Sequence, residues 1–76
     1  MVTPSAVPMY SVISSQLSFI GYNEDRAELF VTFKKGQTYK YSDVPKAIFT
    51  RLKNADSVGS FYATNIKSKY ESEKVN

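Results

Sequence analysis

Two segments of the chain carry the patterns typical of β-strands. In residues 28–33 every second position is a large apolar residue, from Leu29 to Phe33, which is the period-two pattern of a half-buried strand. Residues 10–22 are rich in β-branched and aromatic side chains, but the polar run Ser14-Ser15-Gln16 interrupts them. We therefore expect a first strand with a bulge or break at the serines, followed by a regular second strand.

A third strand contains Tyr39 and Tyr41, and the length of the turn before it decides which way these side chains point. A two-residue turn at Lys35-Gly36 would place both tyrosines on the side of the strand 28–33 that carries Phe30. In that register the two rings would form an exposed aromatic platform.

A three-residue turn over residues 34–36 is the alternative, with Gly36 in a left-handed bulge position. This register turns both tyrosines inward, toward Leu29 and Val31. It is favoured because the two-residue turn would require a positive φ at Lys35, where Asn, Asp or Gly is preferred. The tyrosines are then chiefly core residues, and only their hydroxyl ends reach a surface.

Two short helices are predicted after the strands. The first opens near Pro45, with Ser42 or Asp43 as its cap, and the second follows a cap at Asp56 or Ser57. The apolar positions of both helices recur at helical spacing: Ile48, Phe49, Leu52, Ala55, Val58, Tyr62, Ile66 and Tyr70. The predicted fold class is α+β, a three-stranded antiparallel sheet followed by two helices packed on one face.

The length of 76 residues is that of one small domain. We expect a flexible N-terminal arm over residues 1–9, a folded unit over 10–71 and a frayed C-terminus over 72–76. No apolar run is long enough to span a bilayer and no signal peptide is recognisable, so a cytoplasmic location and no membrane association are expected. A domain this small would gain buried apolar surface as a homodimer or higher oligomer.

Composition argues against most catalytic chemistry. The chain has no cysteine and no histidine, so thiol and imidazole nucleophiles, disulfides and the commonest zinc ligands are excluded. The serines have no evident base beside them. We predict a protein that is not an enzyme, with no catalytic residue, no metal site and no cofactor.

The formal charge of +3, from ten Lys and Arg against seven Asp and Glu, favours anionic partners. Aromatic rings would supply stacking, basic side chains would supply charge, and the amides at the start of the second helix would bind phosphate. The candidate ligand-binding residues are Tyr39, Lys40, Tyr41, Arg51, Ser57 and Lys67. Together they predict a binding module for RNA or a small nucleotide.

From about residue 11 to residue 70 the sequence resembles the KTSC domain, a module named for its occurrence at the C-terminus of some lysyl-tRNA synthetases. The resemblance rests on Ser14-Ser15, Gly21-Tyr22, the segment 29–33, Gly36, Tyr39, Tyr41, Val44-Pro45, Leu52, the segment 55–61, Ile66 and Tyr70. It implies RNA binding, which has been suggested for the family from the synthetase fusion, and it is compatible with a free-standing bacterial or phage protein. The chain has Ser60 and Ala63 where the family often has a basic residue and an asparagine, which weakens a phosphate site at the second helix.

Two alternative functions follow. A phage-encoded, oligomeric copy would act as a sponge that sequesters a nucleotide immune signal between protomers. A protein-interaction module would use a sheet edge, or a sheet face bearing Phe19 and Phe30, to bind a partner.

Overall fold

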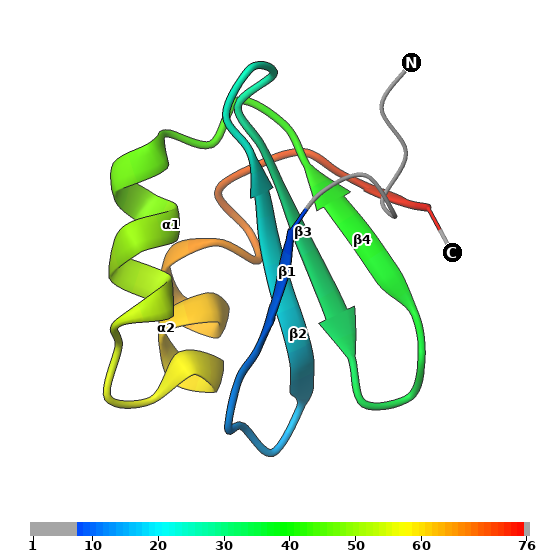
Figure 1. The fold of residues 1–76 in the computed structure, drawn as a ribbon, viewed down its shortest axis with the longest axis vertical. Coiled ribbons are helices and arrows are strands. Elements are labelled where there is room, and N and C mark those ends of the chain that lie inside the picture. Colours follow the sequence, from blue (N-terminus) through cyan, green and yellow to red (C-terminus); the bar gives the residue numbers. More distant parts are fainter. Residues whose placement is uncertain (1–7, 76) are drawn as a thin grey trace.

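The computed structural model describes residues 8–75 and shows an α+β fold in which two helices lie on one face of an antiparallel sheet (Figure 1). The elements are β1 (Met9–Ser11), β2 (Leu17–Asn23), β3 (Glu28–Phe33), β4 (Thr38–Tyr41), α1 (Lys46–Lys53), α2 (Val58–Asn65) and β5 (Ser72–Lys74). The strands lie side by side in chain order. The predicted class and the helices on one face are confirmed, but the predicted count of three strands is wrong, because the sheet has five.

The first additional strand arises because the chain reverses at the serines. The hydroxyl oxygen of Ser14 accepts hydrogen bonds from the amides of Gln16 (3.2 Å) and Leu17 (3.3 Å), and β1 then pairs antiparallel with β2. What the sequence presented as one interrupted strand is therefore a pair of strands joined by a tight loop. Met9 belongs to β1, whereas residues 1–7 of the expected arm lie outside the described residues.

The second additional strand, β5, lies along β4 at the edge of the sheet. The Ser42 amide donates to the Glu71 carbonyl at 3.0 Å, and the Val75 amide donates to the Thr38 carbonyl at 2.9 Å. The side chains of β5 are exposed and polar, so the apolar alternation that identifies a strand in a sequence is missing. Residues Ser72–Lys74 thus lie in the sheet rather than beyond it.

The turn between β3 and β4 has the register favoured by the sequence. Gly36 has a φ of 104°, and the Phe33 amide donates to the Gln37 carbonyl at 2.8 Å. Tyr39 lies opposite Val31, and Tyr41 lies opposite Leu29 in the same way. Both tyrosines therefore face the helices, as predicted for the three-residue turn.

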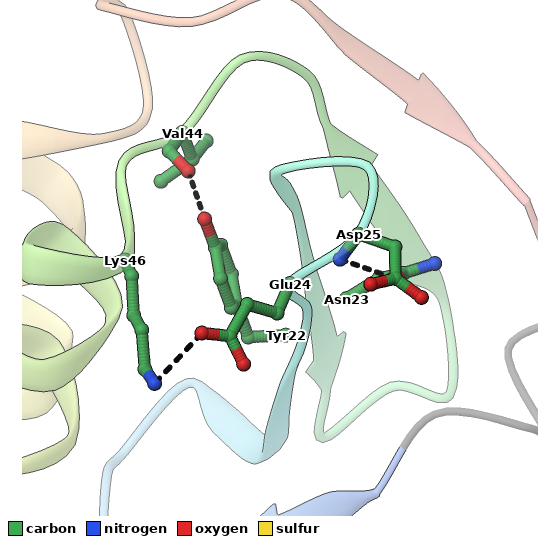
Figure 2. A network of polar contacts seen from close by, with 6 residues as sticks. All are labelled: Tyr22, Asn23, Glu24, Asp25, Val44 and Lys46. Atoms are coloured by element: carbon green, nitrogen blue, oxygen red, sulfur yellow. Dashed lines mark hydrogen bonds and ion pairs between the residues drawn. The ribbon is translucent and has the colours of Figure 1, made fainter.

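The start of α1 differs from the prediction, because no side chain caps it and Pro45 occupies the cap position. Contacts from the β2–β3 region hold this end of the helix instead (Figure 2). The Tyr22 hydroxyl donates to the Val44 carbonyl at 2.6 Å, and the Lys46 ammonium lies 2.9 Å from a Glu24 carboxylate oxygen. The second helix does begin as expected, with the Ser57 hydroxyl accepting from the Ser60 amide at 3.3 Å.

The core lies between the sheet and the helices and consists of Leu17, Ile20, Leu29, Val31, Tyr41, Val44, Phe49, Leu52, Val58, Tyr62 and Ile66. Phe30 lies on the opposite face of the sheet, and its exposed fraction is only 2%. It belongs to the middle strand, where Gly21 and Lys40 lie directly beside it on the neighbouring strands. The expectation that Phe30 and Phe19 together present an exposed aromatic face is therefore wrong for Phe30, whereas Phe19 is 44% exposed.

Within residues 8–75, neither helix has the length and apolar character needed to cross a membrane.

Candidate functional site: a tyrosine–lysine pocket

A pocket of about 730 Å³ opens where the β1–β2 loop, the β3–β4 turn, β4, α2 and β5 meet. Its lining residues are Ser15, Gln16, Phe33, Lys34, Lys35, Gln37, Tyr39, Tyr41, Tyr62, Lys67 and Ser72. We refer to this set as the tyrosine–lysine pocket. Its volume lies within the range of about 300–1,000 Å³ that is usual for small-molecule sites.

The floor of the tyrosine–lysine pocket is aromatic. The hydroxyl groups of Tyr41 and Tyr62 are hydrogen-bonded to each other, and their rings pack edge to face with centroids 5.9 Å apart. The Phe33 ring lies 5.7 Å from the Tyr62 ring, again edge to face. The exposed fractions of Tyr41 and Tyr62 are only 3% and 4%, so the floor is closely packed and largely apolar apart from two hydroxyl groups.

Burial raises the pKa of Tyr41 well above its ordinary value of 10.0, and the hydrogen bond with Tyr62 raises it further. Both causes penalise the phenolate, which carries a charge that the floor cannot solvate. The Tyr41 hydroxyl therefore keeps its proton at neutral pH.

The rim of the pocket is basic. Lys34, Lys35 and Lys67 are exposed and line it, and among the described lining residues there is no carboxylate. The Lys34 amide donates to the Gln16 carbonyl at 2.9 Å, which ties the β3–β4 turn to the β1–β2 loop. A backbone hydrogen bond thus connects the two loops of the rim, and the three lysines give the rim a local positive potential.

Three of the six residues selected from the sequence lie in the tyrosine–lysine pocket: Tyr39, Tyr41 and Lys67. Lys40 lies on the opposite face of the sheet, where its ammonium is 3.4 Å from a Glu28 carboxylate oxygen and 3.7 Å from one of Glu73. This orientation follows from the strand register that turns its two tyrosine neighbours inward.

The remaining two residues lie outside the pocket lining. The Arg51 guanidinium carbon is 5.9 Å from the centroid of the Phe61 ring, and Ser57 caps α2. A Cβ at Gly59, in the first turn of α2, would lie 3.0 Å from the hydroxyl oxygen of Ser14. A side chain of the β1–β2 loop therefore occupies the space beside Gly59, at the helix start whose amides we expected to bind phosphate.

The sequence reasoning missed Lys34 and Lys35 as pocket residues, together with Phe33 and Tyr62. The sequence did contain a signal for the two lysines, because they lie in the three-residue turn that directly precedes the strand of the inward-facing tyrosines. Tyr62 gave no such signal, since its position every fourth residue along α2 is also that of an ordinary core side chain.

The groups that line the tyrosine–lysine pocket can attract anions, form hydrogen bonds and stack on flat rings. The tyrosine–lysine pocket combines ammonium groups, hydroxyl groups, side-chain amides and aromatic rings. Across residues 8–75 no three carboxylate side chains gather as a metal site would require. An anionic ligand with a flat ring matches this combination of groups.

Comparison with known proteins places the chain in a family. The model of the KTSC domain matches residues 13–70. A crystal structure of a KTSC domain protein from Yersinia pestis superposes with a TM-score of 0.87 at 33% sequence identity, over 93% of this chain and 100% of that one. No curated protein matches the chain. Because the family model covers most of the chain and the shared fold covers 93% of it, the chain belongs to the KTSC domain family.

Proposed function

We propose that this protein is a binding module for RNA or a small nucleotide and that the ligand occupies the tyrosine–lysine pocket without being chemically altered. The observation that carries the proposal is the basic rim: Lys34, Lys35 and Lys67 line the same pocket as the aromatic floor, with no carboxylate among the described lining residues. Phosphate groups are attracted to such a rim. A base would stack on the half-buried rings of Phe33 and Tyr39.

Two interactions would contribute to the free energy of ligand binding. Stacking of one base on an aromatic side chain contributes about 1–3 kcal/mol. The exposed ammonium groups add an attraction that salt weakens, because the Debye length is about 8 Å at physiological ionic strength. Binding should therefore be moderate in affinity and sensitive to salt.

The alternative of a protein-interaction module gains less support. The outer strands β1 and β5 have only three residues each, and very short edge strands are a common means of preventing strand addition. The pocket is the better candidate for a ligand.

The test is a titration of the protein with short single-stranded RNA and with ribonucleotides, at low and at physiological salt. A variant with Lys34→Ala, Lys35→Ala and Lys67→Ala should lose affinity by about tenfold or more, which corresponds to about 1.4 kcal/mol. A matched variant with Arg26→Ala, Lys69→Ala and Lys74→Ala has the same net charge but an intact pocket lining. It should bind nearly as well as the original protein.

Equal loss in the two triple variants would show that net charge, and not the pocket, governs binding. Absence of binding by the original protein at both salt concentrations would contradict the proposal altogether. A stoichiometry below one ligand per chain would indicate a site shared between copies, as the sponge hypothesis requires.

A further inference from the structure

At the floor of the tyrosine–lysine pocket, the hydroxyl groups of Tyr41 and Tyr62 are hydrogen-bonded to each other. Resting on the proposed function, we infer that the pocket takes one compact nucleotide rather than a strand of RNA. We further infer that the Tyr41–Tyr62 pair donates a hydrogen bond to an acceptor atom on the ring of that nucleotide.

The inference begins with a count of protons. Two neutral tyrosine hydroxyl groups carry two protons, and the bond between Tyr41 and Tyr62 uses one of them. Within the described residues, neither hydroxyl has another hydrogen-bond partner. One O–H donor therefore remains, whichever of the two groups donates to the other.

The position of this donor makes it available to a ligand. Both tyrosines line the pocket, and only 3% of Tyr41 and 4% of Tyr62 is exposed in total, so water has little access to the pair. A buried donor without an acceptor costs about 1–3 kcal/mol, so an acceptor brought by a ligand would recover that energy. Burial raises the pKa of Tyr41, so its O–H proton is present under physiological conditions.

The size and charge distribution of the pocket favour a compact ligand. A volume of about 730 Å³ suits a molecule of nucleotide size. Proteins that bind single strands instead use a positively charged groove that follows the backbone. Lys40 of β4 lies on the opposite face of the sheet and is paired there with Glu28 and Glu73, so it does not extend the positive charge of the rim. The positive charge at the site is thus concentrated on the rim.

These features define how the ligand would lie. Its phosphate would contact the rim lysines, and its base would rest against Phe33 and Tyr39, which also line the pocket. A carbonyl oxygen or ring nitrogen of the base would then accept the free O–H at the floor. The rim would recognise the phosphate, and the floor would recognise the base.

The experiment compares the original protein with a Tyr41→Phe/Tyr62→Phe double variant, using the common ribonucleoside mono- and diphosphates, pyrophosphate and short single-stranded RNA as probes. We expect a nucleotide to bind the original protein and to lose roughly five- to tenfold in affinity in the double variant, as for one hydrogen bond. Pyrophosphate should bind both proteins equally, since it contacts the rim alone. Each single Tyr→Phe variant keeps one hydroxyl group and should lose less.

Circular dichroism and thermal unfolding of the double variant provide the folding control, because phenylalanine preserves both rings. Equal nucleotide affinity in the original protein and the folded double variant would overturn the role of the hydroxyl pair while leaving the proposed function intact. Binding of RNA with no binding of nucleotides would overturn the inference that the pocket takes a compact ligand. Failure of every probe to bind the original protein would instead refute the proposed function itself, and this inference with it.

Discussion

At the scale of single residues, Tyr41 and Tyr62 serve both the core and the pocket. Removing one hydroxyl group leaves the other buried without its partner, whereas removing both leaves two rings of nearly the same shape. We expect Tyr41→Phe and Tyr62→Phe each to lower the free energy of unfolding by about 1–2 kcal/mol, and the double variant to lose little more than either one. Urea denaturation of the four proteins measures this coupling, and additive losses would show that the hydroxyl pair is not an energetic unit.

The raised pKa values of two tyrosines make stability depend on alkaline pH. Burial raises the pKa of Tyr41 and is also the main cause of the raised pKa of Tyr22. Above the ordinary value of 10.0 the unfolded chain loses protons that the folded chain retains, so stability falls as pH rises. Each such group lowers the free energy of unfolding by at most about 1.4 kcal/mol per pH unit. Denaturation from neutral pH to about pH 11 should show this loss, with a shallower slope in Tyr41→Phe; identical slopes would contradict the assignment.

At the scale of elements, the β3–β4 turn determines which face the pocket tyrosines occupy. Gly36 has a positive φ of 104°, and a Cβ at this position would meet nothing within 4 Å. Gly36→Ala should therefore cost about 1–2 kcal/mol through backbone strain alone. Chemical synthesis with D-alanine at the same position is the matched control, since a D-residue favours positive φ and should preserve stability. Destabilisation by both residues would mean that a side chain at this turn is excluded for another reason.

The edge strand β5 closes one side of the pocket through Ser72, and its pairing protects β4. Deleting residues 71–76 removes the carbonyl that accepts from the Ser42 amide, so hydrogen exchange at Ser42 should become faster. Glu73→Gln loses only a partly exposed ion pair with Lys40, which is worth at most about 1 kcal/mol, and should leave that exchange rate nearly unchanged. Unaltered protection after the deletion would show that β5 does not stay paired in solution.

At the scale of the whole molecule, the pocket connects elements from both ends of the described chain. A ligand there contacts the β1–β2 loop, α2 and β5 together, and it should stabilise the fold as a unit. At a ligand concentration of about 100 times the dissociation constant the gain is about 2.7 kcal/mol, or roughly 10–20 °C in Tm for a domain of this size. Thermal scans with a nucleotide should show this rise in the original protein and a smaller one in the variant lacking Lys34, Lys35 and Lys67. An equal rise in both would locate the ligand elsewhere.

The parts of the fold that could be predicted are those with a local physical signal. The alternation of apolar and other residues indicated β3, and a glycine in the turn indicated the register of Tyr39 and Tyr41. A serine cap indicated the start of α2. The parts that could not be predicted lack such a signal. The three exposed residues of β5 are held by backbone pairing with β4, and the reversal at Ser14 depends on a side-chain hydrogen bond that resembles an irregularity within one strand.

The residues of the candidate site also fall into those that the sequence indicated and those that only the structure revealed. The sequence alone favoured the register in which Tyr39 and Tyr41 face inward, because side-chain direction along a strand alternates and the length of the turn sets which residues share a face. Only the tertiary structure decided which basic residues join them. It brought Lys34, Lys35 and Lys67 to one rim and paired Lys40 with carboxylates on the opposite face. The physical reason is that alternation along a strand is local, whereas a pocket forms between segments whose separation in space no local pattern encodes.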